Sequence, residues 1–218
     1  MSTPSPHPIR LTVTDDLRRS RLTVAFRLLL FIPHYIWLYL WGWVALIVFV
    51  LTWLCALVLG RPPRPFHRFL GAYVRYQTHV IAFVTLVGNP FPGFVGKRGS
   101  YPIDLETPVE PQHQNRLATL FRILLVIPAA FVAYPLLYAL LIAAFFAWWV
   151  SLVRGRTTEG YRDLGAFVLR YQGQVYGYLF LQTARYPNPS PRAEFETPLP
   201  AAQIAEPPPA DTPVPATS

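Results

Sequence analysis

The sequence has little of the chemistry on which disulfide-rich and metal-binding proteins depend. Its one cysteine, Cys55, lies in an apolar run, which excludes a disulfide framework and leaves a cysteine-based metal site without a partner. Charged residues make up only 14% of the chain, and Lys97 is the only lysine. We expect no secretory signal, because residues 1–20 pass from a Pro/Ser segment to a charged one without an apolar core.

Familiar catalytic motifs are also missing. The sequence has no Gly-x-Ser-x-Gly, Walker or dinucleotide-binding glycine pattern, and its apolar stretches hold no pair of carboxylates. The five histidines do not show the spacing of a metal site. We therefore expect that the protein is not an enzyme and binds neither a metal nor a cofactor.

Long uncharged stretches are the main feature that is present. Residues 28–59 and 123–153 contain no Asp, Glu, Lys or Arg, and hydrophobic residues make up 53% of the chain. Each stretch exceeds the ~20 residues that cross a hydrocarbon core of ~30 Å. The net charge of +8 comes from arginines that flank these stretches, which favours lipid headgroups over nucleic acid as the partner. The sequence predicts a multi-pass protein of the cell membrane, in contact with anionic lipids and not with nucleic acid.

The chain also contains an internal duplication. One fixed offset aligns chemically distinctive residues in both halves, which chance does not easily produce. The aligned pairs include Arg21-Leu22 with Arg116-Leu117, Ile32-Pro33 with Ile127-Pro128, Trp53 with Trp148, Gly60-Arg61 with Gly155-Arg156, and Arg75-Tyr76-Gln77 with Arg170-Tyr171-Gln172.

The predicted fold is mainly α, a polytopic membrane protein with two parallel repeats at residues 9–94 and 101–190. Each repeat is expected to hold a short strand, an interfacial amphipathic helix, a transmembrane helix and a second transmembrane helix. In the first repeat, Pro33 should end the interfacial helix, because proline has no amide donor. Two crossings per repeat would relate the repeats by an axis along the membrane normal.

Short alternating segments precede both repeats. Residues 9–13 and 103–106 have the period of two that is typical of strands, and we expect them to meet as a small extramembrane sheet. A weaker echo near 193–197 predicts a short strand in the Pro/Ala-rich tail, residues 191–218. The rest of this tail and residues 1–8 are expected to be disordered. Arginines are more numerous beside the ends of the repeats than at the hairpin tips, which predicts cytoplasmic termini.

Two arginines are the leading candidates for a functional site. Arg75 and Arg170 fall near the middle of the predicted second spanning helices, where an ionisable group usually faces a bundle interior or a cavity. The hypothesis is that they bind an anion or an anionic lipid. The alternative is that they satisfy carbonyl, Tyr or Gln groups between helices, or extend to the headgroups from a helix that lies in the interface. No carboxylate is expected at matching depth, so a proton relay is disfavoured. The candidate ligand-binding residues are Arg75, Arg170, Gln77, Gln172, Tyr76 and Tyr171, and the candidate interfacial basic residues are Arg27 and Arg122.

Two phrases of the sequence resemble a known family. Residues 27–35, Arg-Leu-Leu-Leu-Phe-Ile-Pro-His-Tyr, and residues 181–187, Leu-Gln-Thr-Ala-Arg-Tyr-Pro, are similar to DUF4389, a bacterial family of membrane domains of unknown function that often occur in duplicate. The second repeat departs from the family pattern, since it has Ala129 where His is usual. The resemblance implies a membrane location and no established activity.

Two functions are compatible with these features. The first is a non-enzymatic membrane scaffold or accessory protein that presents its cytoplasmic strands or tail to a protein partner. The second is a small transporter, or an anion- or lipid-binding protein, that uses the arginine pair. A water- or lipid-filled cavity that contains both guanidinium groups would favour the second function, and a closed seam would favour the first.

Overall fold

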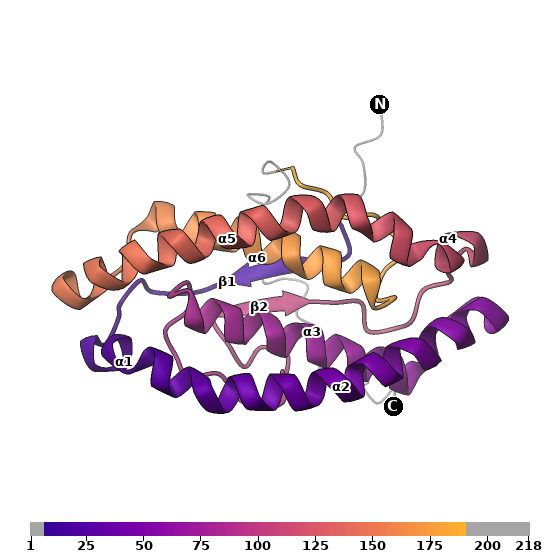
Figure 1. The fold of residues 1–218 in the computed structure, drawn as a ribbon, viewed down its shortest axis with the longest axis horizontal. Helices are drawn as coiled ribbons and strands as arrows, with labels where there is room; N and C mark the ends of the chain where they lie inside the picture. The colour runs from indigo at the N-terminus through magenta and orange to yellow at the C-terminus, as the bar shows by residue number, and fades with distance from the viewer. Residues whose placement is uncertain (1–6, 191–218) are drawn as a thin grey trace, which may run out of the picture.

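The computed structural model describes residues 7–190, and two similar helical units account for most of them. The predicted mainly helical architecture with two repeats is therefore confirmed (Figure 1). In chain order the elements are β1 (Arg10–Val13), α1 (Arg21–Ala25), α2 (Arg27–Leu59), α3 (Arg64–Val84), β2 (Ile103–Glu106), α4 (Arg116–Leu120), α5 (Arg122–Arg154) and α6 (Glu159–Leu179).

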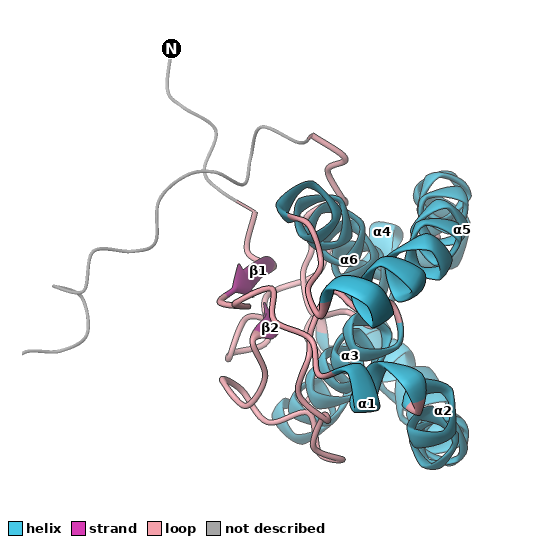
Figure 2. Cartoon of the chain, turned by 90° about the vertical axis from the view of Figure 1, so that its left-hand side faces the viewer, coloured by secondary structure: helices cyan, strands magenta, loops and turns pink. Residues whose placement is uncertain are grey.

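The elements form three layers, which the end-on view of Figure 2 separates clearly. The long helices α2 and α5 make one outer layer, and α3 and α6 pack side by side in the middle. The small sheet lies on the opposite side, where β1 contacts α6 and β2 contacts α3. The middle layer is consequently the most buried part of the protein.

Helices α2 and α5 begin earlier than the sequence predicts. Pro33 lies inside the continuous helix α2, so the predicted break there and the predicted interfacial helix that it would end are wrong. The backbone turns at Phe26 instead, which separates the five-residue helix α1 from α2. Pro33 stands in the second turn of α2 and is exposed, and the helix continues although proline lacks one amide donor. The second repeat turns in the same way at Phe121.

The two repeats exchange contacts at both ends of the molecule. Trp53 near the end of α2 donates its indole N–H to the carbonyl of Thr119 over 2.7 Å, and Trp148 near the end of α5 donates to Val24 over 2.9 Å. The amide of Arg19 donates to Gly155, and the amide of Gln114 donates to Gly60. Each hairpin tip therefore packs against the start of the other repeat.

These contacts fix α2 and α5 in antiparallel orientation (Figure 1). The pseudo-twofold axis is therefore perpendicular to the long helices, and helices that crossed a bilayer in this arrangement would be inverted rather than parallel. The predicted parallel relation between the repeats is wrong. The sequence pattern within one hairpin does not show which end of the other repeat its tip contacts. Basic residues that the sequence assigned to opposite sides of the membrane therefore lie at the same end of the molecule. Arg18 and Arg156, for example, pair through their backbones in an isolated antiparallel β-bridge.

The two predicted strands do form a sheet. β1 and β2 pair antiparallel, with Arg10 opposite Glu106 and Val13 opposite Ile103. Leu105 on β2 is fully buried and fills the space over Gly173, where a Cβ atom would lie 2.4 Å from its side chain. The predicted strand near 193–197 and most of the predicted disordered termini lie outside the described residues. His7, which was expected to be disordered, is buried, and its Nδ1 atom is 3.1 Å from the amide nitrogen of Ile9.

Candidate functional site: an apolar face and buried arginines

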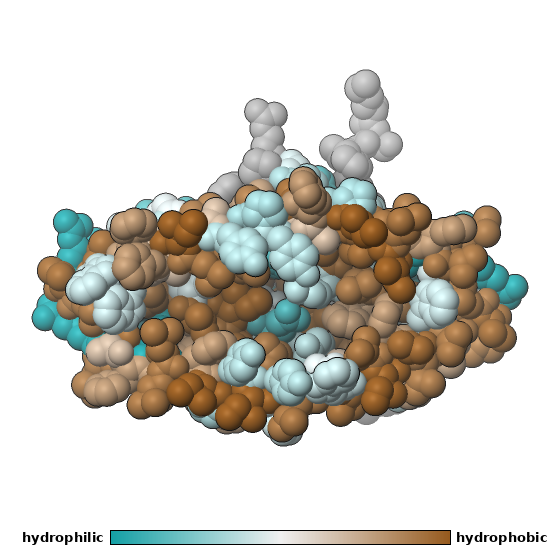
Figure 3. Space-filling model, viewed as in Figure 1, coloured by the Kyte–Doolittle hydropathy of each residue, from teal (hydrophilic) through white to brown (hydrophobic). Residues whose placement is uncertain are grey.

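The outer surface of α2 and α5 is apolar over nearly its whole length. Both helices have 33 residues and are long and apolar enough to cross a membrane. Large hydrophobic side chains are exposed along them, among them Val44 at 49% and Phe146 at 63%. Figure 3 looks onto this face, where brown and pale residues dominate; teal residues gather at the left and right ends, and a smaller teal group is visible near the centre. We call the exposed side chains of α2 and α5 the apolar face.

Helices α3 and α6 differ from α2 and α5. The sequence predicts them as second transmembrane helices, but α2 and α5 alone among the described helices are apolar and long enough to qualify. The reason is that α3 and α6 carry arginine, histidine and glutamine side chains and bury them in the middle layer. Their role in the structure is to connect the apolar face with the sheet.

Arg27 and Arg122, which the sequence suggests as interfacial basic residues, are both buried inside the protein. Each is only 1% exposed. Arg27 donates to the backbone carbonyl of Phe83 over 2.6 Å, and its guanidinium carbon lies 4.5 Å from the centre of the Phe83 ring. Arg122 donates to the carbonyl of Tyr178 over 2.7 Å and lies 4.3 Å from its ring centre. Both carbonyls belong to the last turn of a middle-layer helix, where a positive charge is favourable. These helix ends therefore stabilise the buried guanidinium groups.

Arg75 uses all three guanidinium nitrogens on the protein itself. Nε donates to the carbonyl of Leu105, Nη1 donates to the carbonyl of Gly96, and Nη2 donates to the hydroxyl of Thr107, each over 3.0 Å. Burial lowers the pKa of Arg75, and the nearby carboxylate of Asp104 opposes that shift. The arginine thus fastens α3 to β2 and its flanking loops.

Asp104 on β2 is a buried carboxylate next to Arg75. The sequence predicts no carboxylate near the arginines, yet Oδ1 of Asp104 accepts a hydrogen bond from Nε2 of His79 over 2.7 Å and lies 3.6 Å from Nε of Arg75. Its Oδ2 accepts from the amide of Gly99 over 2.6 Å. Burial raises the pKa of Asp104, but the hydrogen bonds from His79 and Gly99 outweigh it and lower the pKa overall.

Arg170 does not share the contacts of Arg75. Its Nη2 donates to the carbonyl of Ser190 over 2.8 Å, near the end of the described chain, and its guanidinium carbon lies 5.8 Å from the centre of the Phe167 ring. Arg75 instead binds β2 and the loop before it. The two arginines of the duplicated Arg-Tyr-Gln phrase therefore bind different segments.

The tyrosines of the phrase join the middle helices to the outer ones. The hydroxyl of Tyr76 lies 2.7 Å from Nδ1 of His34 on α2. Ala129 occupies the equivalent position in the second repeat, so the hydroxyl of Tyr171 donates to its backbone carbonyl over 3.3 Å instead. Tyr171 therefore keeps a hydrogen bond to α5 although Ala129 replaces the usual histidine.

The glutamines of the phrase differ between the repeats. Nε2 of Gln172 donates to the carbonyl of Ala133 on α5 over 2.8 Å. The side chain of Gln77 is partly buried, and its Oε1 atom has no hydrogen-bond partner among the described residues. The amide of Gln172 and the hydroxyl of Tyr171 therefore join the middle layer to α5.

A basic pocket of about 290 Å³ lies beside α3 in the first repeat. Its lining includes His67, Arg68, Arg75 and Arg98. Arg68 and Arg98 are exposed, whereas His67 is buried and its Nε2 donates to the carbonyl of Pro108 over 3.0 Å. Arg68 shares a helix face with Arg75, but no local signal in the sequence brings Arg98 to them. The pocket is a candidate anion site built from α3, from the segment that holds Arg98 and Thr107, and from Gln182 of the second repeat.

A family model described as a domain of unknown function, DUF4389, matches residues 21–95 and again residues 116–190. No curated protein and no solved structure matches the chain. The two matches cover both helical units from α1 or α4 through the middle-layer helix. The chain is therefore a member of the DUF4389 family that carries the domain twice.

Proposed function

We propose that this protein is a non-enzymatic scaffold or accessory protein of the membrane, held in lipid by the apolar face. The observation that carries this proposal is the separation of polarity between the layers. α2 and α5 expose long uncharged surfaces, whereas β1 on the opposite side exposes Arg10 and Thr12. An apolar surface of this extent is rare on soluble monomers and marks contact with lipid or protein.

The polar groups inside the protein support a structural role. The guanidinium groups of Arg27, Arg75 and Arg122 donate to carbonyl or side-chain oxygens of the chain itself. Nε of Arg27 and Nε of Arg122 make no hydrogen bond within the described residues, but the bonds from the other guanidinium nitrogens hold the layers in one arrangement. Such a frame suits a scaffold better than a carrier that alternates between two states.

The sheet offers the natural surface for a protein partner. β1 pairs with β2 on one edge, and in the described part of the chain its other edge has no strand beside it. An unpaired strand edge can accept an extended segment of another protein. We expect partner binding at β1, on the side away from the apolar face.

Two measurements test the scaffold proposal. The full chain should stay in the membrane pellet after an alkaline carbonate wash, and release into the supernatant would contradict the proposal. A photo-crosslinking residue at Thr12, which is exposed on β1, should give one reproducible adduct with another protein in cells. The same residue at Val44 on the apolar face should give lipid adducts only. Equal protein adducts at both positions would argue against β1 as the partner surface.

Anion binding at the basic pocket is the second candidate function. The favouring observation is that three arginines and a histidine share one pocket. Replacing Arg68 and Arg98 together by Gln should weaken binding to vesicles that contain phosphatidylglycerol by about thirtyfold, at ~1 kcal/mol for each of the two lost surface charges. Arg10→Gln, at an exposed site on β1 outside the pocket, is the control. Equal effects from the pocket variant and the control would remove this candidate.

A further inference from the structure

The long helices do not match the thickness of a bilayer. A helix of 33 residues, as α2 and α5 both are, is about 50 Å long. To cross a hydrocarbon core of ~30 Å, such a helix would have to tilt by more than about 50°, whereas membrane helices tilt by 0–40°. Charged residues stand at both ends, so neither end of these helices can be drawn into the hydrocarbon without burying an arginine.

The position of the sheet opposes a crossing as well. β1 and β2 run beside the middle of α3 and α6, and they lead in opposite directions toward the two ends of the molecule (Figure 1). If α2 and α5 crossed the bilayer, these extended segments would lie at its centre. β1 is exposed there, and an open strand edge in hydrocarbon leaves backbone groups unpaired at a cost of several kcal/mol each.

An orientation parallel to the membrane removes both conflicts. A helix with its side chains is about 10–12 Å thick, and one leaflet contributes about 15 Å of hydrocarbon. The layer of α2 and α5 therefore fits within a single leaflet. The middle layer, with its buried arginines, then lies at the headgroups, and the sheet lies in water.

The charges at the two ends fit this orientation. Arg18, Arg21 and Arg156 stand at one end, and Arg61 and Arg116 stand at the other. The teal patches at both ends of Figure 3 flank the apolar face in the same way. Arginines at both ends of a face in one leaflet all reach phosphate groups of that leaflet.

We propose that α2 and α5 lie in the plane of the membrane and enter one leaflet only, so that both ends of the molecule and the sheet share one side. This inference rests on the proposed function, because it requires that the apolar face is in lipid. The new element of the proposal is that the apolar face contacts the lipids of a single leaflet. The pseudo-twofold axis then lies along the membrane normal, because it exchanges α2 with α5 within one layer and is perpendicular to that layer.

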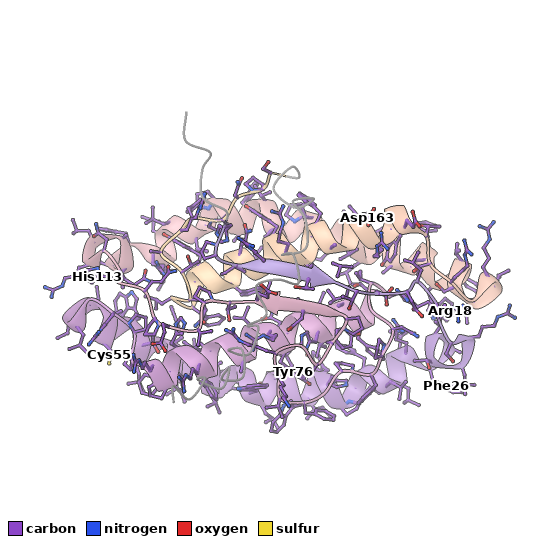
Figure 4. All side chains as sticks on the ribbon, turned by 180° about the vertical axis from the view of Figure 1, so that it is seen from behind. Arg18, Phe26, Cys55, Tyr76, His113 and Asp163 are labelled. Carbon is purple, nitrogen blue, oxygen red and sulfur yellow. The ribbon has the colours of Figure 1, made fainter. Side chains whose placement is uncertain are left out.

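Site-directed labelling from one side of the membrane tests this proposal. In the full chain with Cys55→Ala, single cysteines are placed at Arg61, Arg156 and Arg10, which are all exposed. Figure 4 shows that the two ends of the molecule are far apart, with His113 at one end and Arg18 at the other. Spheroplasts and inside-out vesicles are then treated with a membrane-impermeant maleimide.

All three cysteines should react from the same side, with at least tenfold less reaction from the other side. A control cysteine at Val44 should stay unreactive from both sides until detergent is added. Reaction of positions 61 and 156 from opposite sides, or an unreactive position 10, would overturn the one-leaflet arrangement while leaving the membrane location intact. Release of the protein by carbonate would overturn the membrane location itself, so the two failures are distinguishable.

Discussion

Arg27 on α2 donates a hydrogen bond to the backbone carbonyl of Phe83 on α3 over 2.6 Å. The same relationship recurs in the second repeat, where Arg122 donates to the carbonyl of Tyr178 over 2.7 Å. In both cases the arginine begins a long apolar helix and caps the end of a middle-layer helix. The duplicated arginines therefore hold each hairpin closed at the end opposite its turn.

Replacement of either arginine should destabilise the protein. Arg27→Leu leaves the carbonyls of Phe83 and Gly88 without this donor in a buried site, at a cost of about 2–4 kcal/mol. Arg122→Leu should cost a similar amount, and the exposed control Arg61→Leu less than about 0.5 kcal/mol. The midpoint of unfolding in detergent micelles measures these effects. An Arg27→Leu protein that is as stable as the control would contradict the capping role.

The tryptophans at the hairpin tips should contribute equally. Trp53→Phe and Trp148→Phe each remove an indole N–H that donates to a carbonyl of the other repeat, at about 1 kcal/mol per bond plus a smaller packing loss. Because the two bonds are at opposite ends of the molecule, the double variant should show the sum of the two losses. Denaturation of the three variants measures this. A loss from one variant alone would show that the repeats do not pack symmetrically.

Gly96 and Gly99 form a matched pair for testing the loop that holds Arg75. Both have positive φ, 61° and 66°, so either alanine variant meets about 1–2 kcal/mol of backbone strain. A Cβ atom at Gly96 would also lie 2.3 Å from the carbonyl oxygen of Ala72, whereas one at Gly99 has nothing within 4 Å. Gly96→Ala should therefore be more destabilising than Gly99→Ala by about 1–3 kcal/mol. Equal losses in thermal unfolding would mean that the close approach is absent.

Stability should decline on mild acidification because of buried histidines. Burial lowers the pKa of His67 and of His7 below the usual 6.5. The unfolded chain then binds protons near pH 6.5 while the folded chain does not, so stability falls as the pH drops below that value. The pKa of Asp104 is lowered from 3.8, so its contribution is lost only in stronger acid.

The variant His67→Gln isolates this effect. Its amide can still donate to the carbonyl of Pro108, the bond that His67 Nε2 makes, but it does not titrate. Unfolding measured between pH 7.5 and 5 should show a shallower decline for the variant than for the natural protein. Identical slopes would show that His67 is not the titrating group.

Local patterns in the sequence predict the parts of this fold that depend on local chemistry. The duplication, the helical units and the meeting of residues 9–13 with 103–106 all follow from periodicity and from repeated residues. The break predicted at Pro33 is wrong, because a proline in the sequence shows only that one amide donor is missing. Whether a helix ends there depends on what surrounds the free carbonyl, and at Pro33 the helix continues.

The candidate site was less predictable, because it depends on contacts between distant segments. Arg27 looks like a headgroup-binding residue until α3 is known to end beside it. Asp104 looks like an exposed residue of an alternating strand until β2 is known to pack on α3, next to His79 and Arg75. The alternation of polar and apolar residues in β2 does not show that Asp104 is buried. Pairing of buried polar groups across repeats is a tertiary property that one sequence does not encode locally.

The central claim is that the apolar face of α2 and α5 is in contact with lipid. Spin labels attached in turn to cysteines at Val44, Phe146 and Arg10 in the reconstituted full chain with Cys55→Ala test it by their collision rates with oxygen and with a water-soluble nickel complex. Positions 44 and 146 should collide more with oxygen and position 10 more with nickel. Nickel collisions at positions 44 and 146 as frequent as at position 10 would contradict the account.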